Sequence, residues 1–383
     1  MICDRTTLNV KPVTDALFFA HAKTYDSEIE GADISWNNEL ALHVVELKTS
    51  RPRSDLESLA AHFHDQIKQI NAVLQQFDAQ LLPTAMHPWM DPIAELRLWP
   101  HGDNPWYEQF DKIFNCKGHG WANLQSLHVN FPYGNEEEFV RLHAAIRLAL
   151  PIIPALAASS PIMDGKKGGF KDCRLDVYKT NSKRIPSITG EVIPEVVTSF
   201  KDYHDKILER IRSDLEPHDD EGILEPEWTN ARGAITRFER NAIEIRLVDT
   251  QECPAADLAV ATALITLVKW LYDHFIPAYH TFSEKRLKKI LDASILSAEE
   301  ALLDDPEYLA LFSLKGPITQ GALWQKLIDE RLDIPKSMRG PLQTILNEGT
   351  LATRILKGVE KENLFTVYQR LAACLQEGRQ YHP

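Results

Sequence analysis

Charged and apolar residues alternate between residues 243 and 249, where the sequence is Ile-Glu-Ile-Arg-Leu-Val-Asp. In a β-strand, this alternation would place Glu244 and Arg246 on one face and the three aliphatic residues on the other. A carboxylate beside a guanidinium can hold a metal ion and a phosphate together. The same two residues could instead form a salt bridge on a solvated sheet face, so neighbouring segments must decide between the interpretations.

A second candidate strand, Gln-Ser-Leu-His-Val-Asn-Phe-Pro at residues 125–132, carries His128 and Asn130 between apolar residues. A histidine on a sheet face often has a purely structural role. Two strands that both carry polar groups of these types nevertheless indicate a site for charged ligands.

A third candidate segment, residues 38–49, contains Glu39, His43 and Glu46. In one regular strand Glu39 and Glu46 would face opposite ways, so both reach a common site only across a bulge or a turn. His43 and Glu46 also resemble half of a helical zinc-hydrolase motif, although no second histidine stands at the required offset. A metal hydrolase that uses His43, Glu46 and His128 is therefore one alternative.

Composition limits the classes of function. The net charge of -13 argues against a nucleic-acid surface. The apolar runs at residues 148–163 and 258–268 are shorter than the ~20 residues of a membrane span, so no membrane helix is expected. The first residues lack the pattern of a secretory signal, and the five cysteines form no Cys-x-x-Cys pair. We therefore expect a cytoplasmic protein with reduced thiols.

Hydrophobic periodicity and proline punctuation predict an α+β fold, because strands and helices do not alternate regularly. A strand is expected at residues 124–131. Helices are expected at residues 55–77, 136–150, 194–212 and 255–275, followed by charged helices at 284–295, 321–331, 342–355 and 362–377. These elements predict a sheet-bearing catalytic domain at residues 1–282 and a helical region at residues 283–383.

Several motifs occur in the order typical of one family. They are Met-His-Pro-Trp at 86–89, the 125–132 strand, the Ile153–Pro161 run, Arg174, and Ala-Ile-Glu-Ile-Arg-Leu-Val-Asp-Thr-Gln-Glu-Cys-Pro at 242–254. From about Leu8 to Phe275 the chain resembles the glutamate-cysteine ligase family of the YbdK-like, carboxylate-amine type. The resemblance implies a glutamine-synthetase-like fold, in which an antiparallel sheet forms a half-funnel with helices on its outer face.

The resemblance also implies a reaction. In this family ATP phosphorylates a carboxylate, usually that of glutamate, and an amine such as that of cysteine then displaces phosphate to leave an amide. Clustered acids beside a triphosphate require Mg²⁺ or Mn²⁺.

Roles carried over residue by residue complete the expectation. Arg246 would bind the transferred phosphoryl group or the substrate carboxylate, Arg174 would be a substrate arginine, and Asn130 would contact the nucleotide. The implied metal ligands are Glu39, Glu46, His128 and Glu244. The partners implied are small amino acids, with a homodimer left open.

One departure concerns the start of the chain. Family members open with an acidic strand of pattern Gly-x-Glu-x-Glu, ahead of a segment resembling residues 4–12, and Met1 falls after that place. We therefore expect either a gene start further upstream or an incomplete metal site. The alternative function is a non-catalytic relative that binds a small ligand or a protein partner.

Overall fold

The computed structural model describes all 383 residues and has the expected α+β class. Every strand pair is antiparallel. The strands form two three-stranded sheets, β6-β10-β9 and β2-β3-β4, and three two-stranded sheets, β1-β5, β7-β8 and β11-β12. Their bounds are β1 Ile2–Asp4, β2 Glu28–Ile29, β3 Ile34–Asn38, β4 Val45–Thr49, β5 Ala79–Leu81, β6 Ser126–Pro132, β7 Ile162–Met163, β8 Lys166–Lys167, β9 Ala234–Arg237, β10 Ala242–Asp249, β11 Leu302–Leu303 and β12 Ile318–Thr319.

The sheet β6-β10-β9 places the charged strand in its centre. Ile243 and Ile245 of β10 are fully buried and lie opposite Phe131 and Val129 of β6. Glu244 lies opposite Asn130, so the polar residues of both strands share the other face. The predicted alternation is therefore correct for this part of β10.

Helices cover the apolar face of this sheet. α6 (Glu136–Ala149) and α12 (Pro254–Asp273) pack against each other, and α12 also contacts β6. α12 is long and apolar enough to cross a membrane, but 61% of its most apolar window is buried inside the protein. Packing in the core accounts for its composition.

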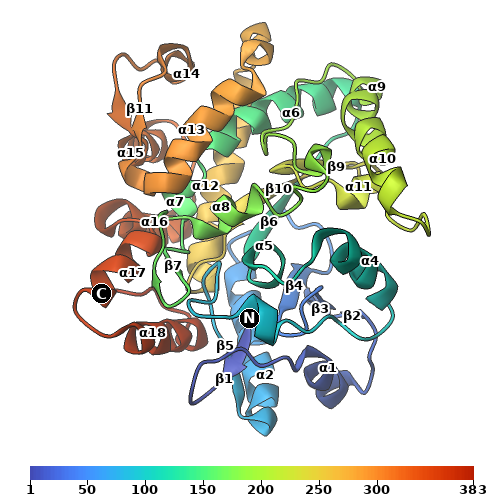
Figure 1. Ribbon diagram of the computed structural model, residues 1–383. Helices are drawn as coiled ribbons and strands as arrows, with labels where there is room; N and C mark the ends of the chain where they lie inside the picture. The colour runs from blue at the N-terminus through green and yellow to red at the C-terminus, as the bar shows by residue number, and fades with distance from the viewer.

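The first part of the chain builds the second sheet, lower in Figure 1. β3 and β4 form a hairpin, and α2 (Leu59–Leu74) packs against β3 and β5. The remaining helices before α12 are α1 Thr14–Ala22, α3 Pro92–Glu95, α4 Asn104–Phe114, α5 His119–Ala122, α7 Pro154–Ala157, α8 Cys173–Tyr178, α9 Phe200–Tyr203, α10 Glu209–Leu215 and α11 Pro226–Thr229.

The last hundred residues are helical, as predicted. The helices are α13 Glu284–Ser297, α14 Pro306–Leu311, α15 Gln320–Glu330, α16 Lys336–Glu348, α17 Leu351–Val359 and α18 Leu364–Glu377. One apolar cluster contains residues from both sides of residue 283, so the two regions share a core. α18 reaches back to α2 and β5, beside the N-terminal strands in Figure 1. The boundary at residue 283 stays a prediction.

Two predicted helices differ from the structure. The helix expected from Pro194 begins at Phe200, where the Ser199 side chain accepts a hydrogen bond from the backbone N–H of Asp202, and a π-helical turn joins α9 to α10. The helix expected at residues 342–355 is two helices. α16 ends at Gly349, whose φ is +100°, and the Thr350 side chain caps α17.

Candidate active site

Glu244 is the centre of a buried charged network. Its side chain is 8% exposed. Arg237 Nε lies 3.4 Å from its Oε2, while Arg246 Nε and His128 Nδ1 each lie 3.7 Å from its Oε1. Burial opposes ionisation of Glu244, but the positive charges of Arg246 and Arg237 outweigh it and lower its pKa to about 2. Glu244 is therefore a carboxylate at neutral pH.

His128 is a neutral imidazole in this network. Burial, together with the positive charge of Arg246, lowers its pKa to about 3. Its contact with Glu244 is thus not an ion pair. The other ring nitrogen, Nε2, lies 2.8 Å from the hydroxyl of Ser126. A neutral imidazole retains the lone pair that a metal ligand needs.

The hairpin of β3 and β4 supplies two further carboxylates. Glu39 follows the last residue of β3, and Glu46 lies in β4 opposite Asn37. Burial among protein atoms and the charge of Glu46 raise the pKa of Glu39 to about 7, against the influence of Arg246. Burial also raises the pKa of Glu46, where Glu244 and Arg246 act in opposite directions.

These electrostatic influences indicate that Glu39, Glu46, Glu244 and Arg246 lie in one neighbourhood. Glu39 nevertheless remains exposed to solvent. In a single regular strand, Glu39 and Glu46 would face opposite ways. The structure avoids this because a turn at residues 40–44 separates them, so the two residues belong to two segments of one hairpin.

A β-bulge in β10 contains Arg246. Pairing with β6 shifts between Ile245 and Val248, so two residues of β10 occupy the space of one. On the other side, the backbone N–H of Arg246 donates to the carbonyl oxygen of Gly233 over 2.9 Å. A Cβ on Gly233 would come within 2.7 Å of the buried Leu247 side chain, so the bulge requires glycine here.

Arg174 lies behind the bulge and is 1% exposed. Its Nε donates to Asp249, and its Nη1 donates to the main-chain oxygen of Arg246 over 3.3 Å. Asp249 also accepts hydrogen bonds from the backbone N–H of Ser159 and the hydroxyl of Ser160. This places the predicted substrate arginine in a buried ion pair that holds the end of β10.

Of the remaining residues that the sequence singled out, Asn130 lies at the site, whereas His43 and His87 lie elsewhere. Asn130 shares the polar face with Glu244 and is exposed. His43 is fully buried elsewhere, with Nε2 2.9 Å from the carbonyl oxygen of Ala122. The metal-hydrolase alternative required His43 as a ligand beside His128, and the position of His43 does not support it. His87 of the Met-His-Pro-Trp motif is likewise buried and contacts the carbonyl oxygen of Leu8 over 2.7 Å.

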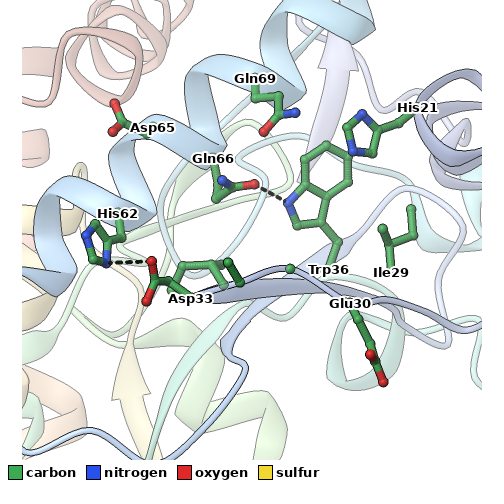
Figure 2. A pocket seen from close by; sticks show the side chains of 12 residues that line it. His21, Ile29, Glu30, Asp33, Trp36, His62, Asp65, Gln66 and Gln69 are labelled. Carbon is green, nitrogen blue, oxygen red and sulfur yellow. Dashed lines mark hydrogen bonds and ion pairs between the residues drawn. The ribbon is translucent and has the colours of Figure 1, made fainter.

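A separate pocket of about 360 Å³ lies between α2 and the strands β2 and β3. Figure 2 shows Trp36 in this pocket, hydrogen-bonded to Gln66. Trp36 precedes Asn37 on β3, so the pocket is on the sheet face opposite Glu46. It contains none of the predicted site residues.

Sequence inspection missed two residues of the site. Arg237 ends β9 and binds Glu244, and its guanidinium carbon lies 4.3 Å from the ring centre of Trp228. Asn241, with a φ of +47°, could have indicated the hairpin that joins β9 to β10. Tyr178 is 7% exposed on α8, four residues after Arg174. No local signal in the sequence identifies it.

The donor set can be compared with the needs of a divalent cation. Mg²⁺ prefers carboxylate oxygens, and neighbouring carboxylates add to burial in raising the pKa values of Glu39 and Glu46. No three His, Cys, Asp or Glu side chains lie close enough together to hold a metal ion in the structure. The residues therefore match such an ion in chemical type, but they do not form a ready-made metal site in this structure.

Comparisons with known proteins agree on the family. The model of glutamate-cysteine ligase family 2 matches residues 22–364. An uncharacterized protein of Archaeoglobus fulgidus is 31% identical over 97% of this chain and 96% of its own length. A putative glutamate–cysteine ligase 2 of Bradyrhizobium diazoefficiens is 25% identical over 82% of this chain and 69% of its own length.

A solved structure supports the fold. The glutamate–cysteine ligase of Francisella tularensis, crystallised in complex with AMP, aligns with a TM-score of 0.66 over all of this chain and 87% of that one, at 13% identity. This likeness confirms the predicted ligase-like fold. The chain belongs to glutamate-cysteine ligase family 2.

Proposed function

We propose that this protein is an ATP-dependent carboxylate-amine ligase that joins glutamate to an amine such as cysteine. One observation carries the proposal: on the polar face of β10, Arg246 and His128 each lie 3.7 Å from Glu244, and the charges of this group also act on Glu39 and Glu46 of the hairpin. Carboxylates opposite a guanidinium suit a bound metal–triphosphate beside a substrate carboxylate.

The reaction needs no nucleophile from the protein. A carboxylate oxygen of glutamate attacks the γ-phosphorus of ATP, the bond to the β-γ bridging oxygen breaks, and ADP leaves. The amine nitrogen then attacks the acyl carbon, the carbon–oxygen bond to phosphate breaks, and the amine loses a proton. The protein has to position the reactants and balance their charge.

Arg246 is suited to the transferred group. Its guanidinium keeps its charge at all relevant pH values and offers a planar fork to two oxygens. The side chain is 25% exposed, so a ligand can reach it. Glu244 holds it from one side at 3.7 Å, which limits its freedom before substrate binds.

Glu39, Glu46, Glu244 and His128 are the proposed ligands of Mg²⁺ or Mn²⁺. A bound divalent cation would neutralise phosphate charge during transfer. Glu244 is ionised and His128 is neutral, which are the states required of ligands. We extend the proposal to the cytoplasm as its location, since all five cysteines are unpaired.

The direct test is release of phosphate from ATP by the purified protein with Mg²⁺, glutamate and cysteine. We expect release only when both amino acids are present. With glutamate and hydroxylamine, a hydroxamate should form, because hydroxylamine traps an acyl phosphate. ATP-independent turnover, or no turnover across a broad panel of acids and amines, would contradict the proposal.

Arg246→Lys tests the assigned role while keeping a positive charge. Loss of the fork should lower kcat about 100- to 1000-fold, the usual effect of removing one group that stabilises the transition state. Arg212→Lys on α10 is the matched control, because Arg212 is exposed and far along the chain from the site. It should leave kcat unchanged.

A further inference from the structure

One exposed tryptophan lies against the arginine that ends β9 and contacts Glu244. Trp228 belongs to α11, which packs against β9. The Cζ of Arg237 lies 4.3 Å from the centre of the Trp228 ring. A guanidinium this close to an indole is held by a cation–π attraction, which is strongest where water is excluded. The Arg237 side chain is 7% exposed, so the contact is largely desolvated.

Two further contacts hold the same guanidinium. The Nε of Arg237 lies 3.4 Å from Oε2 of Glu244, and its Nη1 donates to the main-chain oxygen of Glu227 over 3.1 Å. The Glu227 side chain also accepts a hydrogen bond from the backbone N–H of Phe238, which holds α11 at the end of β9. The Trp228 ring is therefore an additional support for a guanidinium that already donates within its plane.

The contact with Arg237 occupies one oxygen of Glu244. Oε2 lies beside Arg237, whereas Oε1 lies 3.7 Å from both Arg246 Nε and His128 Nδ1. A carboxylate that is held at one oxygen has less freedom to rotate, so less order must be gained when ligands arrive. Arg237 is thus placed to orient the carboxylate of Glu244 within the candidate site.

The surroundings of Trp228 argue against a role in the core. The residue is 42% exposed and belongs to none of the apolar clusters. The Cζ of a second arginine, Arg240, lies 5.8 Å from the same ring. The charges of Arg237 and Arg240 act on Glu244 and Glu46, respectively. The ring therefore lies beside two arginines that influence carboxylates of the candidate site.

We infer that Trp228 is a positioning residue of the candidate site, because its ring holds the Arg237 guanidinium against Glu244. The inference rests on the proposed function, since it assigns Trp228 to the same site. Trp228 touches no reactant in this role. It acts through Arg237, which in turn keeps Oε1 of Glu244 beside Arg246 and His128.

Two replacements of Trp228 measure its effect on the reaction. Trp228→Leu removes the aromatic face but keeps an apolar side chain, and kcat for phosphate release should fall about 5- to 30-fold, the factor expected for a desolvated cation–π contact. KM for glutamate should stay within about 2-fold of the parent value, because the contact orders the site and does not bind substrate. Trp228→Phe keeps an aromatic face and should recover most of kcat. Full kcat in Trp228→Leu would overturn the inference.

A double-mutant cycle shows whether Trp228 acts through Arg237. Arg237→Lys keeps the charge but lacks the planar guanidinium that lies on the ring. Adding Trp228→Leu to Arg237→Lys should lower kcat little further, because the contact is already lost. Losses that multiply would show that Trp228 acts on the reaction by another route, which would also overturn the inference.

The Nε–H resonance of Arg237 provides a readout that needs no turnover. A buried and immobilised guanidinium should give a resolved proton–nitrogen correlation signal, which is identified by its disappearance in Arg237→Lys. The signal should broaden or disappear in Trp228→Leu and persist in Trp228→Phe. An unchanged signal in Trp228→Leu would show that other contacts suffice to hold Arg237, and the inference would be wrong.

Trp106→Leu is the matched control. Trp106 is 44% exposed on α4, and the cation–π contacts of the chain do not include it. Its replacement should change neither kcat nor the Arg237 signal, and equal losses in both tryptophan variants would contradict the inference. If the parent protein has no ligase turnover, the proposed function fails, and the Arg237 signal alone decides whether Trp228 holds that guanidinium.

Discussion

The Nη1 of Arg174 donates to the main-chain oxygen of Arg246 over 3.3 Å, at the point where β10 leaves regular pairing with β6. A buried ion pair with Asp249 fixes Arg174 in turn. The orientation of the accessible arginine therefore depends on a buried one. The bulge that contains Arg246 is therefore supported by a second, buried layer of charged residues.

Glu46→Gln should separate metal binding from stability. In the parent protein, Mg²⁺ or Mn²⁺ at ten times its Kd should stabilise the fold by about 1.4 kcal/mol. In the variant, thermal unfolding should show little or no stabilisation by metal, while stability without metal stays equal or rises because repulsion from Glu244 is relieved. Glu28→Gln on β2, at the other edge of the same sheet, is the control and should keep the full metal response. An undiminished response in Glu46→Gln would remove this residue from the ligand set.

Gly233→Ala should damage the site through packing. The added Cβ would meet the fully buried Leu247 side chain at 2.7 Å, and overpacking of this kind costs about 1–3 kcal/mol. Urea unfolding measures the loss, and kcat should fall with it because the bulge carries Arg246. Gly169→Ala meets nothing within 4 Å and should change neither quantity. Normal activity in Gly233→Ala would show that the bulge tolerates displacement.

His87 should make the fold sensitive to acid. Burial lowers the pKa of His87 to about 4, from an ordinary 6.5 in the unfolded chain. Between these values the unfolded state binds more protons, so the stabilising contribution is complete above pH 6.5 and is lost as pH falls towards 4. The shift corresponds to roughly 3 kcal/mol. His87→Gln, which keeps a donor for Leu8, should show a smaller loss in urea unfolding between pH 7 and pH 5.

His204→Gln provides the comparison for that series. His204 is exposed on the surface. Its replacement should leave the pH dependence of the parent protein intact, and an equal change in both variants would mean that burial of His87 is not the cause.

Arg354→Met should destabilise the fold by about 3–5 kcal/mol, because it leaves Glu252 buried without its charge partner at 2.5 Å. The double variant Arg354→Met/Glu252→Gln should regain much of that stability, since Gln keeps an acceptor for the backbone N–H of Tyr381. Arg370→Met breaks an exposed pair with Glu362 and should cost less than about 1 kcal/mol. Calorimetric unfolding of the parent protein and the three variants measures these stabilities. A double variant that is no more stable than Arg354→Met would contradict the prediction.

The sequence predicted the elements better than their junctions. Glu244 and Arg246 were correctly placed on one face, because alternation is a local property. The bulge after Ile245 depends on β6, more than a hundred residues earlier, and no local pattern reports it. A bulge or turn between Glu39 and Glu46 was predicted only because both residues needed to reach one site. Residues 40–44 contain neither glycine nor proline that would mark a turn.

The break between α16 and α17 does have a signal in the sequence, but the regular apolar spacing led to the prediction of one continuous helix. Gly349 and Thr350 are typical residues for ending one helix and capping the next, yet the apolar spacing runs through them. The burial of Arg174 and the position of Tyr178 had no such signal. Both depend on how α8 packs behind β10, which is a tertiary contact.

The contact between Glu252 and Tyr381 also sets an order of events during synthesis. Glu252 lies three residues after the end of β10, but the Tyr381 N–H, from which it accepts a hydrogen bond, is 129 residues further along the chain. At about 5–20 residues per second, a ribosome needs roughly 6–26 s to make that interval. During this time the carboxylate of Glu252 lacks the backbone donor that it has in the folded chain, so the segment after β10 reaches its final hydrogen bonding only once Tyr381, beyond α18, has been made.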